Sequence, residues 1–344
     1  MEFRPCIDIH NGKVKQIVGG SLKDEKDFAK ENFVSEMQAA DYAALYREKG
    51  LRGGHIILLN AADSPYYEAD LMQAKGALLA WQGALQVGGG IHAENAASFL
   101  DFGASHVIVT SYVFVGGEIR FDRLQQLVKA VGKEHVVLDL SCRKKGDSYY
   151  IVTDRWQKFT TERVTNELLE KLSSRCSEFL VHAVDVEGKS GGIEKPLAQF
   201  LGDWGKIPIT YAGGVHSFKD LEELSRLGRN RLNVTIGSAL DLFGGPMSYE
   251  QVLTYIISDK LSIHSITLDY LLVAVIGCVL FPLMIMIYTY RNIDEVISKQ
   301  FKWRNSKVDS FHYRLSYSWN RCQMSFVVCL LFFYILSLLF KFQL

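Results

Sequence analysis

Short apolar runs alternate with longer amphipathic stretches through residue 257, and this alternation limits the fold more than any other feature of the sequence. The β-branched runs indicate buried parallel strands, and the stretches between them have helical spacing. Eight strand–helix units in about 250 residues predict an α/β fold of the (β/α)₈, or TIM-barrel, type. A doubly wound open sheet is the alternative, because buried parallel strands alone do not show that a sheet closes. The predicted strands are residues 3–9, 55–59, 84–87, 106–110, 135–140, 179–184, 207–212 and 233–237, and the predicted helices are 34–49, 68–80, 93–102, 119–131, 162–175, 194–203, 218–228 and 248–257.

An internal repeat favours the closed barrel. The segments QVGGGI (86–91) and HVIVTS (106–111) are echoed by TYAGGV (210–215) and NVTIGS (233–238). CIDIHNGK, which begins at Cys6, is echoed in the same way by VLDLSCRKKG, which begins at Val137. Repeats at nearly constant spacing indicate duplicated structural units, so the sequence predicts a barrel built from two half-barrels.

The last 86 residues differ from the rest, and we expect two domains, 1–258 and 259–344. Residues 270–290 and 322–340 contain no charged side chain, and as helices each is long enough to cross a bilayer. They are candidate transmembrane helices of a hydrophobic helical extension that gives a possible membrane association. The loop between them is basic, and the positive-inside rule would then put the barrel on the far side of the membrane. An extension unrelated to the work of the barrel is the alternative.

Composition excludes several classes of function. The chain has 38 basic and 38 acidic residues, but 9 basic and 5 acidic residues lie after residue 258, so the barrel is mildly acidic and we expect no nucleic-acid partner. The six cysteines form no CxxC pair and no zinc-ligand spacing, so we expect reduced thiols and no metal. The first strand begins near the N-terminus, which predicts a cytoplasmic barrel without a targeting segment.

Two aspartates are the candidate catalytic residues. Asp8 and Asp139 occupy matching repeat positions near the carboxyl ends of the first and fifth strands. Those strands lie opposite each other in an eight-stranded barrel, and active sites form at that end of the strands. Two facing carboxylates suit a reaction that needs an acid and a base on opposite sides of a substrate.

Glycine-rich turns follow four of the strands and predict two phosphate sites. Glycine lets backbone N–H groups approach a phosphate closely, and Ser and Thr hydroxyls add further donors. Because the turns fall in two pairs on opposite sides of the barrel, they indicate a ligand with a phosphate at each end. The residues are Gly88, Gly89, Gly90, Thr110 and Ser111 in the first pair, and Gly213, Gly214, Gly237 and Ser238 in the second.

Three further side chains are candidate substrate contacts. The segment 142–158 is long enough for a hairpin over the barrel mouth. Within it, Trp156 is suited to stacking on a planar heterocycle, and Arg143 to approaching an anion. His182, on the sixth strand, is suited to proton transfer or to hydrogen bonding with a substrate hydroxyl.

These motifs together resemble the phosphoribosylformimino-aminoimidazole-carboxamide ribotide isomerases of histidine biosynthesis. The resemblance is strongest to the branch of this family found in fungi, plants and some bacteria. The resemblance covers residues 2–256 and also includes TDRWQK, FLVHAVDVEG and TIGSALDLFGG. It implies a (β/α)₈ barrel and a substrate with two phosphoribosyl groups. It further implies an Amadori rearrangement in which Asp139 is the general acid and Asp8 the general base, with no cofactor or metal. Many bacterial relatives have Thr in place of His182 and Asp in place of Asn60.

Other functions stay open at this point. The sister family, the cyclase subunit of imidazole glycerol phosphate synthase, has the same duplicated barrel and the same two aspartates. The insertion that runs from SCRKK to TDRWQK, together with the segment DVEGKSGG, favours the isomerase over it. Dual activity on phosphoribosylanthranilate is a variant of the isomerase, and a membrane-tethered barrel that binds phosphorylated ligands without turning them over is the alternative from another class. We expect the barrel to be a monomer.

Overall fold

The computed structural model describes residues 1–17, 31–154, 156–187, 191–258, 284 and 287–288. The chain divides into two compact units, Met1–Ser258 and Asp259–Leu344. The two candidate membrane spans, 270–290 and 322–340, lie outside the described residues except for three isolated positions. Within the part of the chain that is described, no helix is long and apolar enough to cross a bilayer.

Eight parallel strands form a closed barrel in the first unit. They pair in sequence order, and the last strand returns to the first, because Phe3 forms a parallel bridge with Val234 and the amide of Arg4 donates to the Val234 carbonyl at 2.8 Å. The open sheet is therefore excluded. The strands are β1 (Cys6–His10), β4 (His55–Leu58), β5 (Gln86–Gly88), β6 (His106–Val109), β9 (Val136–Asp139), β13 (Glu178–His182), β14 (Ile209–Ala212) and β15 (Leu232–Thr235).

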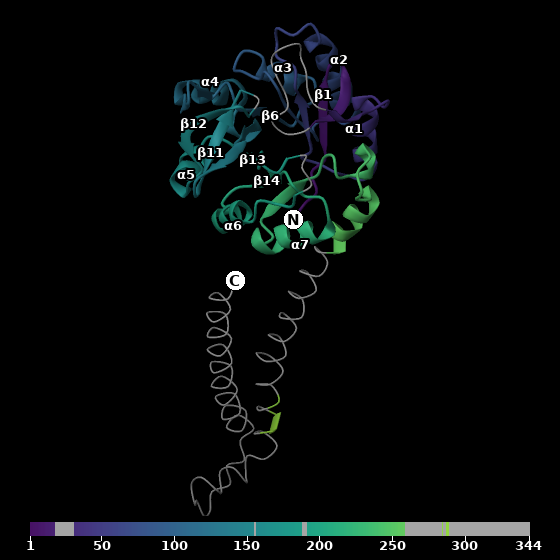
Figure 1. Ribbon diagram of the computed structural model, residues 1–344, viewed down its shortest axis with the longest axis vertical. Helices are drawn as coiled ribbons and strands as arrows, with labels where there is room; N and C mark the ends of the chain where they lie inside the picture. Colours follow the sequence, from purple (N-terminus) through teal and green to yellow (C-terminus); the bar gives the residue numbers. More distant parts are fainter. Residues whose placement is uncertain (18–30, 155, 188–190, 259–283, 285–286, 289–344) are drawn as a thin grey trace, which may run out of the picture. The chain divides into compact units, whose positions relative to one another are not determined.

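Helices surround the barrel strands, as Figure 1 shows. Their starts follow local rules: the side chains of Thr165 and Ser217 cap α5 and α7, and a proline lies in the first turn of α6. In the described part of the chain the helices are α1 (Ala39–Glu48), α2 (Tyr67–Ala80), α3 (Ala96–Asp101), α4 (Phe121–Val131), α5 (Asn166–Ser173), α6 (Lys195–Trp204) and α7 (Phe218–Leu227). The 3₁₀ helices η2 (Lys133–His135) and η3 (Asp241–Phe243) and helical turns over 249–258 also belong to this part.

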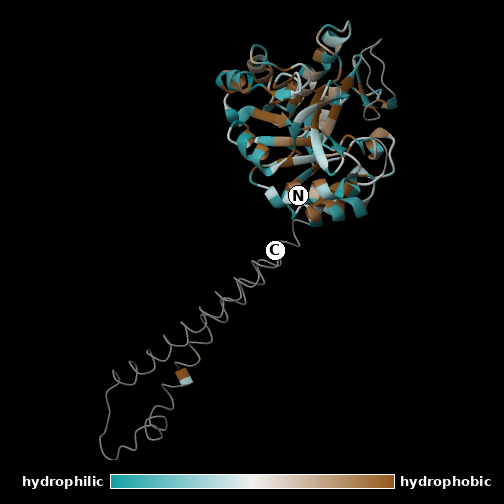
Figure 2. Cartoon of the chain, turned by 60° about the vertical axis from the view of Figure 1, so that its left-hand side comes forward, coloured by the Kyte–Doolittle hydropathy of each residue, from teal (hydrophilic) through white to brown (hydrophobic). Residues whose placement is uncertain are grey.

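Successive residues of each barrel strand point alternately to two different packed regions, one between strands and helices and one on the barrel axis. One set faces the helices and forms the large apolar cluster, and Figure 2 shows apolar residues along the strands and on the helices. The other set faces the barrel axis, where Ile108, Val137, Leu180 and Ala212 form a separate apolar layer. Residues two apart on a strand point the same way, so the side chains that precede and follow this layer also face the axis.

A polar layer closes the amino-terminal end of the barrel. The buried Glu178 carboxylate accepts hydrogen bonds from Thr210 at 2.6 Å and from Gln86 at 3.0 Å, and it forms an ion pair with Arg4. The apolar layer lies between this floor and the opposite end of the strands. The polar groups Asp8, Asp139 and His182 lie on the axis at that opposite end, and the ring of His55 on β4 lies beside that of His182, with 6.2 Å between the centroids.

Among the residues that the structure describes, three small antiparallel elements lie outside the barrel strands. β2 (Lys13–Ile17) and β3 (Glu31–Val34) extend the sheet beyond β1, where the sequence pattern predicted only the start of a helix at 34. The expected hairpin over 142–158 is a three-stranded sheet of β10 (Cys142–Lys145), β11 (Ser148–Thr153) and β12 (Lys158–Arg163). Its third strand occupies residues 162–163, so the helix predicted from 162 begins later, at Asn166. The third element pairs β7 (Phe114–Val115) with β8 (Glu118–Ile119).

Candidate active site

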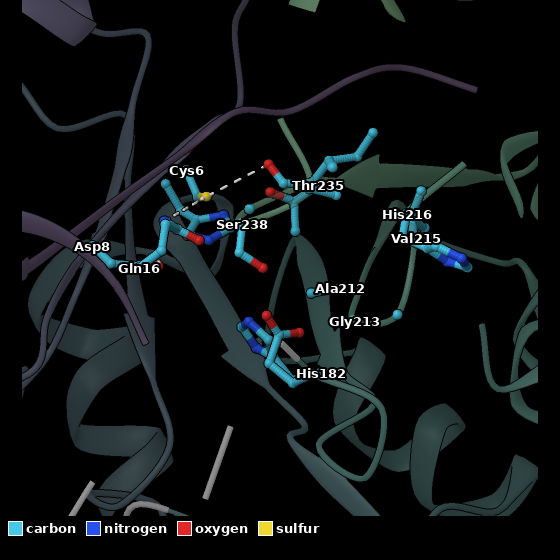
Figure 3. Close-up of a pocket in the computed structure, with 16 residues that line it drawn as sticks. Cys6, Asp8, Gln16, His182, Ala212, Gly213, Val215, His216, Thr235 and Ser238 are labelled. Atoms are coloured by element: carbon cyan, nitrogen blue, oxygen red, sulfur yellow. Dashed lines mark hydrogen bonds between the residues drawn. The ribbon is translucent and has the colours of Figure 1, made fainter. Parts of the chain in front are cut away.

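Two hollows lie at the carboxyl ends of the barrel strands, and each contains one of the two aspartates. The Asp8 hollow also contains the second set of glycine turns, and Figure 3 shows Asp8 and Gln16 on one side of it with His182 and Gly213 across from them. The Asp139 hollow contains the first set of turns together with Trp156. The structure therefore brings the sequence-predicted residues together in two groups, Asp8, His182, Gly213, Gly214, Gly237 and Ser238 in one, and Gly88, Gly89, Gly90, Thr110, Ser111, Asp139 and Trp156 in the other.

The glycine turns of the two hollows have matching backbones. Gly89 and Gly90 have φ values of 103° and 70°, and Gly213 and Gly214 have values of 111° and 80°. All four lie in the left-handed region, which favours glycine. A Cβ on Gly89 would lie 2.2 Å from the Leu58 carbonyl oxygen, so the turn also needs glycine for space. The same local geometry in both halves agrees with a duplicated half-barrel.

Asp8 is held in an environment that favours its protonated form. The Gln16 side-chain amide donates to its Oδ2 at 3.1 Å. Burial raises the pKa of Asp8 to about 7, with a smaller upward contribution from the charge of Glu187, while His182 and Gln16 act in the opposite direction. A carboxyl group with this pKa takes up and releases protons near neutral pH, which suits a general base.

Asp139 is held in its ionised form. Its Oδ1 accepts hydrogen bonds from the Ser141 amide and hydroxyl, both at 2.8 Å. Burial alone would raise the pKa of Asp139, but His182, Ser141 and Thr110 together lower it below its ordinary value. The two aspartates thus have different proton affinities although they occupy matching positions of the repeat.

His182 connects the two hollows. It lines the Asp8 hollow, and its Nδ1 lies 3.8 Å from Asp139 Oδ1, too long for a hydrogen bond but within ion-pair distance. Burial acts to lower the pKa of His182, yet Asp139, Glu187 and Asp8 raise it to about 9. The imidazole is therefore a cation among three carboxyl groups.

Trp156 and Arg143 come from the lid sheet, defined as β10–β12, and its loops. The backbone of Trp156 is left-handed, with φ of 69°. Its Nε1 donates to the Ser141 hydroxyl at 3.0 Å, so the lid tryptophan is linked to Asp139 through one serine. Arg143 lines neither hollow; its Nε donates to Asp185 at 2.8 Å, which anchors the lid sheet to the segment after β13.

Three polar residues of the site were missed by sequence reasoning: Gln16, Ser141 and Glu187. Gln16 comes from the unpredicted strand β2, and Ser141 lies two residues after Asp139, just before the segment 142–158 that was interpreted as a lid. Glu187 lines the Asp8 hollow, and its buried Oε2 has no hydrogen-bond partner among the described residues. Burial raises the pKa of Glu187, opposed by His182. Its place in FLVHAVDVEG, five residues after His182, was the available signal.

The fold and the two hollows define a (β/α)₈ barrel of the duplicated type, in which each hollow contains one buried aspartate and one set of glycine turns. Comparison with known proteins agrees with this class. The family model described as histidine biosynthesis protein matches residues 2–245. Among the described residues no group of three or more His, Cys, Asp or Glu side chains is arranged to hold a metal ion.

Curated relatives narrow the class further. The chain is 51% identical over 267 residues to a chloroplastic 1-(5-phosphoribosyl)-5-((5-phosphoribosylamino)methylideneamino)imidazole-4-carboxamide isomerase of Medicago truncatula, covering 76% of this chain and 84% of the relative. Isomerases of the same name from Neurospora crassa and Saccharomyces cerevisiae are 45% and 41% identical, each covering 71% of this chain and 93% of the relative. The chain belongs to this family of histidine biosynthesis isomerases.

Proposed function

We propose that the chain converts the bis-phosphoribosyl aminoaldose named in its relatives to the corresponding aminoketose, an Amadori rearrangement. The observation that carries the proposal is the pairing of one carboxyl group with one set of glycine turns in each hollow. A substrate with a phosphoribosyl group at each end matches this arrangement, because each phosphate meets one set of turns and the aminosugar lies between the carboxyl groups.

The two aspartates divide the proton transfers. Asp139 delivers a proton to the ring oxygen of the aminoaldose as the C1′–oxygen bond breaks, and a Schiff base forms at C1′. Asp8 then removes the C2′ proton, and the resulting enolamine tautomerises to the ketose. Since Asp8 must be ionised to accept this proton and its pKa is about 7, turnover falls as the pH is lowered through 7.

The turns and the lid bind and orient the substrate. Backbone N–H groups and hydroxyls of the Asp139 hollow, from Gly88 to Ser111, hold one phosphate, and those from Gly213 to Ser238 hold the other. Trp156 stacks on the imidazole carboxamide while Ser141 fixes its indole N–H. Arg143 contributes through the lid, which it ties to Asp185. Both carboxyl groups and both sets of turns come from one chain, which is consistent with a monomeric barrel.

The alternatives are weaker on specific grounds. The curated relatives quoted above carry the isomerase name, and none of them is named a cyclase. A barrel that only binds its ligand has no use for two carboxyl groups with opposite pKa shifts, since both would be expected to pair with fixed cations.

The decisive experiment is turnover of the full chain with the bis-phosphoribosyl aminoaldose, with phosphoribosylanthranilate tested beside it. We expect conversion of the first substrate, and loss of most turnover in Asp139→Asn with substrate affinity nearly unchanged. Asp122→Asn, the same change at an exposed ion pair with Arg120, is the matched control and retains turnover. No conversion by the folded chain, or ammonia-dependent consumption of the aminoketose instead, contradicts the proposal.

The division of the chain at residue 258 is a separate part of the proposal. The compact unit Met1–Ser258 contains both hollows, so residues 1–258 are expected to match the full chain in turnover. Membrane association through residues 270–290 and 322–340 is tested by centrifuging cell extracts at high speed without detergent. Recovery of the full chain in the supernatant would exclude an anchor.

A further inference from the structure

His182 occupies a place that the two-aspartate mechanism does not use. It ends β13, with its side chain 13% exposed, and charged or titratable groups face it from several elements. Asp139 lies on β9, Asp8 on β1, Glu187 on the segment after β13, and His55 on β4 with its ring centroid 6.2 Å away. Carboxyl groups therefore outnumber cations around the imidazole.

Asp139 has too many stabilising partners to hold a proton by itself. Two hydrogen bonds from Ser141 converge on its Oδ1, and the His182 ring faces the same oxygen. Hydrogen-bond donors and cations stabilise a carboxylate and oppose its protonation. A general acid must carry a proton when the substrate arrives, so the proton for ring opening needs another store.

The position of His182 suits it to hold the proton that Asp139 needs. Its Nδ1 is buried and has no hydrogen-bond partner among the described residues, and 3.8 Å separates it from Asp139 Oδ1. A shift of less than 1 Å would bring the two atoms to hydrogen-bond distance. His55 is unsuited to the role, because burial and the neighbouring His182 charge lower its pKa to about 3 and leave it neutral.

We propose that His182 is the proton donor for Asp139, holding on Nδ1 the proton that Asp139 passes to the substrate ring oxygen. This inference rests on the proposed isomerase function. In the first step the His182 N–H bond breaks and an Asp139 O–H bond forms, which neutralises both groups. In the second step that proton moves to the ring oxygen as the C1′–oxygen electron pair stays on the oxygen, and Asp139 returns to its carboxylate form. After the ketose forms, Asp8 releases the C2′ proton to solvent and His182 takes up one proton from solvent, so both groups return to their starting states. His182 acts through Asp139 and is a positioning residue, not one that touches the reacting atoms.

The charge state is tested without substrate. In the full chain, the ring of His182 is titrated by nuclear magnetic resonance, with its signal assigned from its loss in His182→Asn. We expect a pKa near 9, and a decrease of about two to three units in Asp139→Asn, because an ion pair at 3.8 Å is lost. A His182 pKa near 6.5 that does not change in Asp139→Asn overturns the proposal.

The role in catalysis is tested by the pH profile of turnover. The His182–Asp139 pair keeps its one proton up to about pH 9, so the wild-type rate should decline only above that value. His182→Asn retains an N–H donor near Nδ1 but no titratable proton, and should shift the alkaline limb of kcat down by at least two units, with KM changed less than threefold.

His106→Asn is the matched control. His106 begins β6 at the opposite end of the barrel and hydrogen bonds with Ser105, so its substitution should leave the alkaline limb in place. An unshifted limb in His182→Asn overturns the inference. If the wild-type chain has no turnover at all, the proposed function fails, and the resonance titration still decides whether His182 carries the proton.

Discussion

Replacing Gly89 with alanine should damage the first phosphate turn far more than the same change at the next residue. Gly89 follows β5, and the new Cβ would lie 2.2 Å from the Leu58 carbonyl oxygen, where an ordinary contact is at least 3.4 Å. Leu58 cannot retreat, because it pairs with Ile9 of β1 and is 3% exposed. The turn must therefore move by about 1 Å.

The size of the effect follows from two contributions. A left-handed backbone costs a non-glycine residue about 1–2 kcal/mol, and forcing an extra methyl group into a packed site adds about 1–3 kcal/mol. Gly90→Ala has only the backbone contribution, since its Cβ would lie 3.5 Å from the Tyr67 hydroxyl, which is an ordinary contact distance. We expect destabilisation of about 2–5 kcal/mol for Gly89→Ala and about 1–2 kcal/mol for Gly90→Ala.

The assay is thermal unfolding of both variants, followed by steady-state kinetics. One kcal/mol corresponds to about 2–4 °C in Tm for a domain of this size. Because a displaced turn misplaces the N–H donors for the phosphate, KM of Gly89→Ala should rise by about tenfold or more, beyond that of Gly90→Ala. Equal Tm and KM values in the two variants would refute the close-approach reasoning.

Three further predictions concern the acid/base pair, the lid and the barrel floor. Asp8→Asn should lose about 100- to 10,000-fold in kcat, yet unfold at a higher temperature than the wild-type chain above pH 7. Because burial raises the pKa of Asp8, its ionisation destabilises the folded state increasingly from pH 4 to 7, and a lower Tm of the variant would contradict this argument. Trp156→Phe keeps the ring but loses the N–H bond to Ser141, so kcat should fall about fivefold, against a much larger loss in Trp156→Ala; equal kinetics for the two would argue against stacking. Arg4→Met leaves the Glu178 carboxylate buried without its cation and should destabilise the barrel by about 3–5 kcal/mol in urea unfolding, a loss that Arg4→Met/Glu178→Met should partly restore.

The order of elements and the two aspartates could be predicted from the sequence because the signals are local. An apolar β-branched run predicts a strand wherever it occurs, and the residue at its carboxyl end reaches the barrel mouth once the fold class is known. All eight predicted strands overlap barrel strands of the structure. The repeat of glycine turns was equally visible, and the matching φ values of Gly89 and Gly213 show why glycine stands at both positions.

Neighbours distant in sequence could not be predicted in this way. Strand β2 places Gln16 beside Asp8, and the segment after β13 places Glu187 in the same hollow. No sequence motif predicts either contact. Arg143 was expected to approach an anion, and the structure shows that it donates to Asp185, a partner that the sequence did not predict. In each case a side chain's partner depends on a loop path that no short pattern encodes.

By itself the sequence determined the family, the alternation of strands and helices, and the chemical type of the groups at the barrel mouth, because these follow from residue identity and period. Only the tertiary structure decided that the sheet closes through Phe3 and Val234. It also decided that the pKa values of two aspartates at matching repeat positions shift in opposite directions. The physical reason is that a pKa depends on burial and on nearby charges and hydrogen bonds. The fold alone gives Asp139 two hydrogen bonds from Ser141 and the nearby His182 ring, whereas Asp8 accepts one from Gln16 and also faces the charge of Glu187.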